Sequence, residues 1–217
     1  MFKRFFLAAV TVAIGLASQS FAQSIFTNAI TDLNPSASNP YATGQVVDAG
    51  ITATGIGRGP TTAAESAANR YAARGWNAAA FDTNKYFTFT LTPNAGNAIN
   101  LTNFIYTGQA SGTGPSFFAF RSSLDTFTNN IGTPLAGGAT IDLSGAPFQN
   151  LTSASEFRLY GWNASSTAGT FSVNDFTFNG TITAVPEPTS LALLGIAGCA
   201  GLVAAYRRRK SKKIATV

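Results

Sequence analysis

The chain has 217 residues and a net charge of +5, yet only 11% of its residues are charged, against roughly 25% in an average soluble protein. It contains no histidine and one cysteine, which excludes Ser-His-Asp and Cys-His catalytic systems, histidine-bound zinc and a disulfide within the chain. A hydrophobic share of 45% is enough to bury a core, so the composition favours an all-β exported protein over a disordered chain.

The first 22 residues have the layout of a secretory signal peptide. A cationic start is followed by the almost wholly apolar residues 5–17 and then by small residues up to Ala22. We therefore predict cleavage between Ala22 and Gln23, and a mature chain that lies outside the cytoplasm. An uncleaved N-terminal anchor is the less favoured interpretation, because the apolar run is short for a membrane span.

Residues 23–184 form the predicted secreted domain. This segment has six basic and eight acidic side chains, and thus a net charge of −2. The positive charge of the whole chain therefore belongs to the terminal segments. Since the domain has no basic stripe, nucleic acid is not a predicted partner.

The start of this domain combines an irregular segment, one strand and one helix. Residues 23–45 are rich in Asn, Ser, Pro and Ala and predict an irregular lead-in, and residues 46–54 predict a strand. A short helix is predicted over Thr62–Arg74, because Thr62 and Glu65 have capping-box spacing, alanine dominates the interior and Gly75 follows.

Short β-strands separated by Gly- and Asn-rich turns follow. Alternation places Phe87 and Phe89 on one face of its strand, and it places Phe157 and Leu159 inward with Arg158 on the opposite face. We predict an antiparallel β-sandwich of the jelly-roll type with one short helix. The predicted strands are Tyr86–Leu91, Ile99–Tyr106, Phe117–Arg121, Ala139–Leu143, Glu156–Trp162 and Thr170–Thr183.

The last of these strands changes phase. Phe171 and Val173 share one face, whereas Phe176 and Phe178 fall on the other, which predicts a β-bulge or a break at Asn174 and Asp175. Without that slip, Asp175 would point inward and need a partner or an ion. A structural calcium ion at Asp175 is the less favoured alternative, because no Asp-rich cluster accompanies it. We predict no metal and no cofactor.

The segment after the domain predicts a membrane helix. Pro186, Glu187 and Pro188 favour an extended backbone, since proline fixes φ and restrains the residue before it. Residues 191–206 are uncharged, and a helix over them would rise about 24 Å, which thinning of the bilayer and flanking residues extend to a span. The basic cluster that follows must remain in the cytoplasm, which leaves the domain outside. The cluster consists of Arg207, Arg208, Arg209 and Lys210.

These three parts, on a chain with a predicted signal peptide, resemble the PEP-CTERM sorting domain of exported bacterial proteins. The resemblance covers residues 185–213. It implies an exosortase-type membrane protease or transpeptidase as a partner, which processes the chain near Pro186. It also implies transient anchoring in the inner membrane and delivery to the cell surface or an extracellular matrix, with a structural role in exopolysaccharide or biofilm. The alternative is an ordinary tail anchor.

The domain itself resembles, more weakly, the ectodomains found before such tails, which implies a β-sandwich of unassigned activity. Arg121 and Asp125 lie in one of the segments that carry this resemblance, and we interpret them as a local loop lock. No acidic pair sits in a motif that indicates catalysis, so the chain is not predicted to be an enzyme.

The main alternative function is that of a carbohydrate-binding jelly-roll module. Such modules stack sugars on exposed aromatic rings. Four aromatic side chains are candidates for such a platform, although packing in the core or a groove is the favoured interpretation of each: Trp76, Tyr106, Tyr160 and Trp162.

Overall fold

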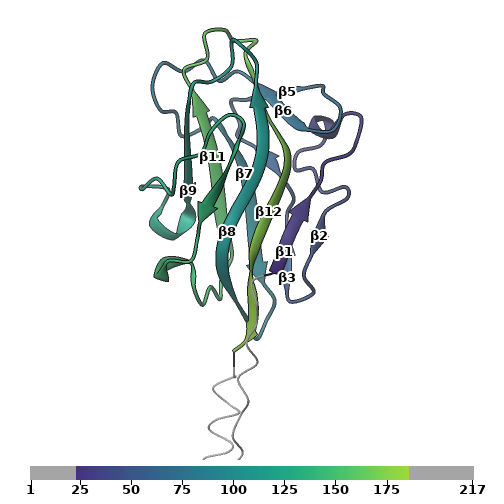
Figure 1. Ribbon diagram of the computed structural model, residues 1–217, viewed down its shortest axis with the longest axis vertical. Coiled ribbons are helices and arrows are strands. Elements are labelled where there is room, and N and C mark those ends of the chain that lie inside the picture. Colours follow the sequence, from purple (N-terminus) through teal and green to yellow (C-terminus); the bar gives the residue numbers. More distant parts are fainter. Residues whose placement is uncertain (1–22, 186–217) are drawn as a thin grey trace, which may run out of the picture.

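The computed structural model describes residues 23–185, which form two antiparallel β-sheets packed face to face (Figure 1). The first sheet has the order β10 (Gly138–Asp142), β8 (Asn97–Ala110), β12 (Thr170–Ala184), β1 (Gln23–Asn28) and β2 (Val46–Val47). Its other two strands are β6 (Tyr71–Arg74), which pairs with the first part of β12, and β5 (Ala63–Glu65), which pairs with β6. The second sheet places β3 (Ile51–Ala53) and β4 (Gly57–Arg58) against β7 (Tyr86–Pro93), followed by β11 (Ser155–Trp162) and β9 (Phe117–Ser122).

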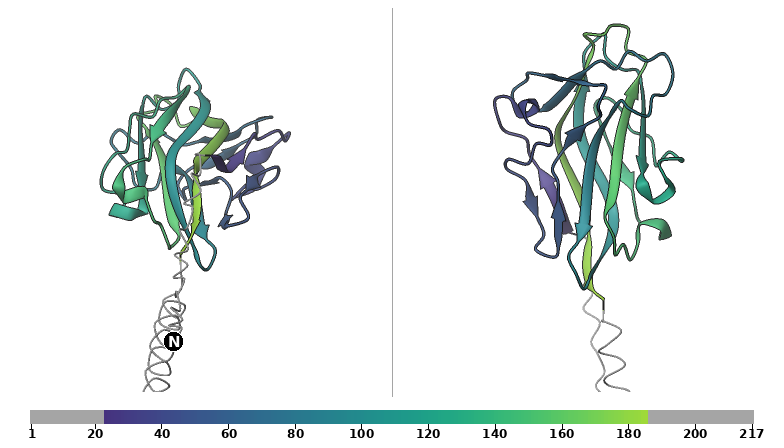
Figure 2. Two further views of the ribbon diagram at one scale, coloured as in Figure 1. Left: turned by 60° about the horizontal axis from the view of Figure 1, so that its bottom comes forward. Right: turned by 180° about the vertical axis from the view of Figure 1, so that it is seen from behind.

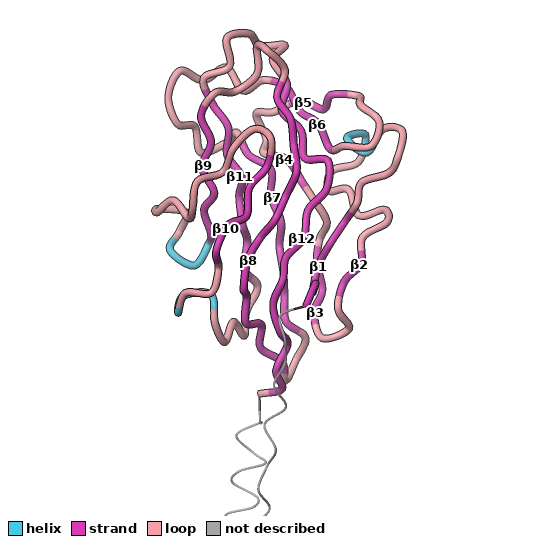
Figure 3. The backbone as a smooth tube through the Cα atoms, in the orientation of Figure 1, coloured by secondary structure: helices cyan, strands magenta, loops and turns pink. Residues whose placement is uncertain are grey.

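The helical content of the described residues is limited to three short 3-10 turns. These lie in the connections between strands, as the tube drawing shows (Figure 3). They are η1 (Pro35–Ala37), η2 (Ser123–Asp125) and η3 (Ala146–Phe148).

The predicted all-β sandwich is confirmed, and its strand order is that of a jelly roll. From β6 to β12, each strand lies in the sheet opposite to that of the strand before it, so that β6-β12-β8-β10 faces β7-β11-β9 (Figure 2). The outermost position of the second sheet, beside β9, is taken by a loop. In that loop the Ile131 N–H donates to the Phe120 carbonyl at 2.8 Å.

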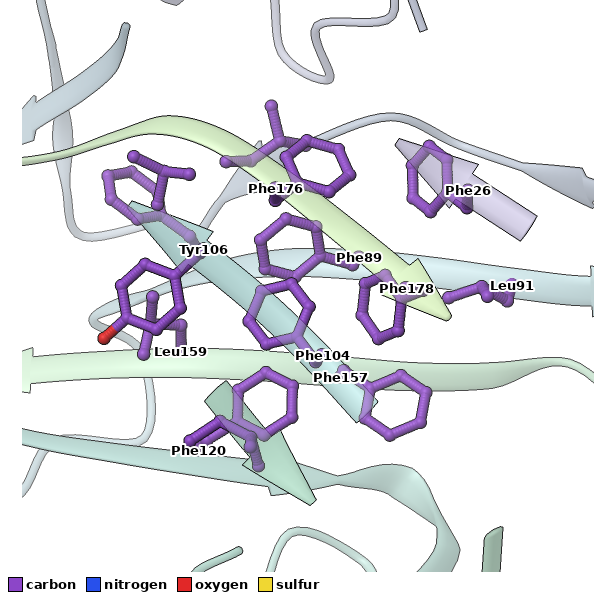
Figure 4. Close-up of a cluster of buried hydrophobic side chains, with 14 of the residues drawn as sticks. Phe26, Phe89, Leu91, Phe104, Tyr106, Phe120, Phe157, Leu159, Phe176 and Phe178 are labelled. Carbon is purple, nitrogen blue, oxygen red and sulfur yellow. The ribbon is translucent and has the colours of Figure 1, made fainter. Parts of the chain in front are cut away.

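Phenylalanine rings from both sheets fill the space between the layers (Figure 4). Phe104 of β8 stacks on Phe120 of β9 at 4.7 Å between ring centroids and contacts Phe178 of β12 at 4.5 Å. Phe89 of β7 meets Phe176 of β12 at 4.8 Å. Because each buried aromatic pair contributes about 0.5–1.5 kcal/mol beyond its buried area, this cluster holds the two sheets together.

The predicted helix over Thr62–Arg74 is wrong. The segment forms the hairpin of β5 and β6, in which Ala63 pairs with Arg74, and β6 in turn pairs with β12. Tyr71 is fully buried. An isolated short helix is marginal in water, and the ladder to β12 together with this burial outweighs the helix propensity of alanine.

The predicted irregular lead-in is also wrong in its first part. Residues 23–28 form β1, and Phe26 pairs with Phe178 in the middle of the first sheet. A register shift between Ser24 and Phe26 lets both Ile25 and Phe26 be buried, which hides the alternation that would reveal a strand. The predicted strand over 46–54 is divided between β2 of the first sheet and β3 of the second.

The predicted change of phase in the last strand is confirmed. The pairing of β12 with β8 shifts register between Val173 and Asp175, so Asn174 is the extra residue. Phe171, Val173, Phe176 and Phe178 are therefore all buried in the core.

Candidate functional site

The predicted sorting and processing residues lie at the limits of the described structure. Gln23, after the predicted signal peptidase site, begins β1 and pairs with Gly180 of β12. Val185 follows β12, and its N–H donates to the Gly96 carbonyl at 2.7 Å. The two junctions therefore lie at one end of the sandwich, the lower end in Figure 1. The other residues of the predicted cleavage site, sorting segment and basic cluster lie outside the described residues, and so do the predictions made for them: Ala22, Pro186, Glu187, Pro188, Arg207, Arg208, Arg209 and Lys210.

Three of the four aromatic candidates for a sugar platform are buried. Trp76, Tyr106 and Tyr160 are at most 1% exposed. The Trp76 indole donates to the Ala73 carbonyl at 2.7 Å, and the Tyr106 hydroxyl donates to the Leu135 carbonyl at 2.6 Å. The rings of all three are thus packed inside the fold, and the polar atoms of Trp76 and Tyr106 are hydrogen bonded there. Of the four candidates, Trp162 alone keeps a surface position.

Trp162 belongs to a set of rings and guanidinium groups on the outward face of the second sheet. On this face Trp162 of β11 pairs with Phe117 of β9, and Arg158 pairs with Arg121. Tyr160 lies between the two pairs and is opposite Tyr86 of β7. We call this surface the aromatic–arginine face and define it by Phe81, Tyr86, Phe117, Arg121, Phe127, Arg158, Tyr160 and Trp162.

Two loop phenylalanines cover the arginines of this face. Phe81, from the connection between β6 and β7, lies 4.0 Å from Arg121 Cζ, measured to the ring centroid. Phe127, after η2, lies 3.9 Å from Arg158 Cζ, and Tyr86 lies 4.2 Å from the same atom. Cation–π contacts of this kind stabilise by about 0.5–2 kcal/mol, depending on exposure.

The two arginines differ in their polar partners. Arg158 Nε donates to Glu156 Oε1 at 2.7 Å, and that carboxylate also accepts from the Thr88 hydroxyl at 2.9 Å. Arg121 donates to neutral acceptors, Asn130 Oδ1 at 2.8 Å and the Phe127 carbonyl at 2.9 Å. Burial lowers the pKa of Arg158, but its interactions with Glu156 and the Tyr160 hydroxyl outweigh this and hold the pKa above its ordinary value.

Tyr160 is the buried centre of the face. Its hydroxyl makes no hydrogen bond to the described residues, and burial raises the pKa of Tyr160 although the Arg158 and Arg121 guanidinium groups lower it. The group thus remains a neutral phenol.

The loop after η2 is held by hydrogen bonds to Asp125 and by a hydrogen bond from Arg121. Asp125 accepts hydrogen bonds from the backbone N–H groups of Asn129 at 2.9 Å and Thr128 at 3.3 Å. Slight burial raises the pKa of Asp125, but these bonds hold it below its ordinary value. The ion pairs among residues 23–185 are Arg74–Glu65 and Arg158–Glu156, so Arg121 and Asp125 lock the loop separately and do not pair directly.

Asp175 has one side-chain partner, because its carboxylate accepts a hydrogen bond from the Thr107 hydroxyl on β8. It lies at the bulge and is partly exposed. Within residues 23–185, no group of three or more Asp, Glu, Cys or His side chains comes together in a way that could hold a metal ion. Asp175 therefore belongs to no such group among the described residues.

A cavity of about 480 Å³ lies beside the same loop. Its lining joins the apolar Ile131 and Phe148 to Asp125, whose oxygens are already engaged by the loop backbone. It offers no pair of free titratable groups, so the aromatic–arginine face is the stronger candidate site.

The aromatic–arginine face was only partly foreseeable. Alternation places Arg158 outward on its strand, as predicted, and the same alternation places Tyr160 and Trp162 on that face. The pairing of Arg158 with Arg121 depends on the register between β11 and β9, which a single strand pattern does not contain. Phe81 lies in an Asn- and Ala-rich loop that carries no signal for a role.

Comparison with protein families gives one match, to the PEP-CTERM protein-sorting motif over residues 184–210. This match begins at the last residue of β12 and contains the predicted Pro-Glu-Pro segment. Comparison with curated proteins and with solved structures gives no match. Among residues 23–185, no helix is long and apolar enough to cross a membrane.

Proposed function

We propose that this chain, which carries a PEP-CTERM sorting motif, is a structural protein of the cell surface or extracellular matrix that associates with exopolysaccharide. The motif marks an exported protein that is anchored transiently in the membrane and sorted by an exosortase-type enzyme. The observation that carries the proposal is this match over residues 184–210.

The junction between the domain and the motif supports this route. β12 ends at Ala184, and Val185 is still hydrogen bonded to Gly96, so the folded domain reaches the start of the Pro-Glu-Pro segment without a linker. The prolines favour an extended backbone there, which is the form that a protease or transpeptidase cleft accepts. The proposed membrane helix and basic cluster follow and leave the domain on the outer side.

The N-terminal junction supports the same arrangement. Gln23, the first residue after the proposed signal peptide, lies beside the end of β12. Both translocation and anchoring therefore act at one end of the sandwich. The opposite end, which carries the loop 111–115, points away from the membrane while the chain is anchored (Figure 1).

The proposed role is structural and not catalytic. The outward side of the first sheet carries paired hydroxyl and amide side chains: Thr27 bonds Thr177 at 2.8 Å, and Asn179 donates to Asn103 at 2.8 Å. Such a neutral polar surface suits a protein embedded in hydrated polysaccharide, because it makes many weak hydrogen bonds and few ionic ones.

A carbohydrate-binding module is the second candidate function, and one specific observation favours it. Phe117 is 53% exposed and stacks against Trp162 with 5.7 Å between ring centroids. Exposed large rings held in place by a sheet are the usual platforms for sugar rings.

The sorting route is tested by replacing Pro186, Glu187 and Pro188 with alanine in the producing bacterium and following the protein by cell fractionation. We expect the variant to accumulate in the inner membrane fraction, whereas the wild type leaves it. A matched control replaces three exposed residues of the domain, Leu33, Val46 and Leu135, with alanine and should not change delivery. Unchanged delivery of the Pro-Glu-Pro variant would contradict the proposal.

A further inference from the structure

Two arginines occupy opposite positions on neighbouring strands of the aromatic–arginine face. Arg121 of β9 and Arg158 of β11 are directly paired in register. Like charges in this position repel, so the pair costs stability unless something offsets it. Glu156 neutralises Arg158, and Arg121 has no carboxylate partner among the described residues.

The same pair retains hydrogen-bond donors. A guanidinium group has five N–H donors in a planar fork. Arg121 engages protein acceptors through Nε and Nη1, and Arg158 does so through Nε. Within residues 23–185, the Nη2 group of Arg121 has no acceptor, whereas the Arg158 guanidinium group also lies beside the Tyr160 hydroxyl. This arrangement fits a planar carboxylate, which accepts two N–H bonds from one guanidinium group or one from each.

The rings around the pair hold it in position. Phe81 and Phe127 each cover one guanidinium group at about van der Waals distance, 4.0 and 3.9 Å to the ring centroid. Side chains already ordered in the free protein lose less entropy when a ligand binds. The site is thus preorganised for an anion.

The aromatic rings extend this site toward the first residue of β9, Phe117. Phe81 touches both Arg121 and Trp162, with 5.5 Å between the Phe81 and Trp162 ring centroids, and Trp162 stacks on the exposed Phe117. A ligand that spans the face therefore presents an anionic group at one end and a flat apolar surface at the other. A sugar ring with C–H groups on its face and a carboxylate on a neighbouring unit has this combination.

We propose that the aromatic–arginine face binds a carboxylate-bearing polysaccharide, with a uronate carboxylate at Arg121 and Arg158 and a sugar ring against Phe117 and Trp162. The inference rests on the proposed association with exopolysaccharide and names the class of polymer. A nucleic acid is a poorer occupant, because its backbone carries one charge per roughly 1.7 Å and needs a basic stripe. The domain has a net charge of −2, from six basic and eight acidic side chains.

The test measures binding of the purified full-length chain, in detergent, to polygalacturonate. The same polymer with its carboxylates methyl-esterified serves as the matched neutral probe. We expect binding to polygalacturonate that weakens with added salt, and at least tenfold weaker binding to the ester, because charged hydrogen bonds contribute about 1.5–3 kcal/mol.

Variants then assign the site. Arg121→Gln and Arg158→Gln should each weaken binding about tenfold or more, and Trp162→Ala should weaken binding to both polymers. Arg74→Gln is the control, because Arg74 is an exposed, ion-paired arginine of the other sheet and should bind as the wild type does. Thermal unfolding of every variant shows that the fold is kept, and Arg121→Lys, which retains the charge without the fork, should fall between Arg121→Gln and the wild type.

Equal binding to the acid and the ester, or wild-type binding by both Gln variants, would overturn the proposed site. Surface delivery is measured separately by fractionation. A chain that reaches the cell surface but ignores polygalacturonate therefore overturns this site and leaves the sorting route standing, whereas a chain that binds polygalacturonate but is never delivered overturns the proposed function alone.

Discussion

Gln23 pairs with Gly180, so the first described residue of the chain lies beside the last part of β12, the strand that runs into the sorting motif. β12 continues from Gly180 to Ala184 with β8 as its partner. The strand that leads into the motif is thus the one that runs through the centre of the first sheet. A change at the end of β12 is therefore expected to affect both the stability of the domain and the presentation of the tail.

Replacing Gly180 with alanine should destabilise the domain. A Cβ atom at this position would lie 2.4 Å from the Asn100 carbonyl oxygen, a backbone atom that cannot move without disturbing β8. We expect a loss of about 1–3 kcal/mol in the free energy of unfolding, measured by urea denaturation. Gly112→Ala is the control, because nothing lies within 4 Å of a Cβ atom there, and its unfolding midpoint should be that of the wild type. Equal midpoints for the two variants would show that the close approach at Gly180 is absent.

The central phenylalanine cluster should dominate stability. Phe104 is fully buried and contacts rings from both sheets, so Phe104→Ala should cost about 3–5 kcal/mol. Leu33→Ala, at a side chain that is 83% exposed, should change the free energy of unfolding by less than about 0.5 kcal/mol. A loss of under 1 kcal/mol at Phe104 would contradict the packing described for the core.

Stability should be flat near neutral pH and fall in alkali. The chain has no histidine, so no histidine changes charge between pH 5 and 8. Burial raises the pKa of Tyr106 well above its ordinary value of 10.0. The unfolded state therefore releases this proton at lower pH than the folded state, and the free energy of unfolding decreases once the pH exceeds about 10. Thermal melts from pH 6 to 11 test this, and Tyr106→Phe should make the alkaline decrease shallower.

The stability of the domain at low pH should depend on carboxylates that accept hydrogen bonds from backbone N–H groups. Asp125 and Asp142 both have a pKa below the ordinary value of 3.8, Asp142 because of its bonds to Ser144. A lowered pKa in the folded state stabilises above the unfolded value and is lost as the pH falls through the folded value. The melting temperature should therefore hold down to about pH 5 and decline below pH 4. A decline that begins near pH 6 would point to a titrating group that the structure does not contain.

Much of the fold was predictable because the strands obey simple rules. Strict alternation in β7 and β11 placed Phe87, Phe89, Phe157 and Leu159 in the core, and the change of phase at Asn174 predicted the bulge. These signals are local and depend on one strand at a time.

The errors arose where long-range pairing decides. The alanines of β6 favour a helix locally, but their pairing with β12 and the burial of Tyr71 select a strand. Long-range contacts likewise decided the candidate site. Trp76 and Tyr106 are core residues. Arg121 and Phe117 share a face with Trp162 only because of the alignment of β9 with β11.

Export and sorting are tested most directly by the intact mass of the protein recovered from the cell surface or the medium. We expect a chain that begins at Gln23 and ends near Pro186, and so lacks residues 1–22 and the basic cluster at 207–210. A surface protein with the full mass of 22.5 kDa, unprocessed at both ends, would contradict it.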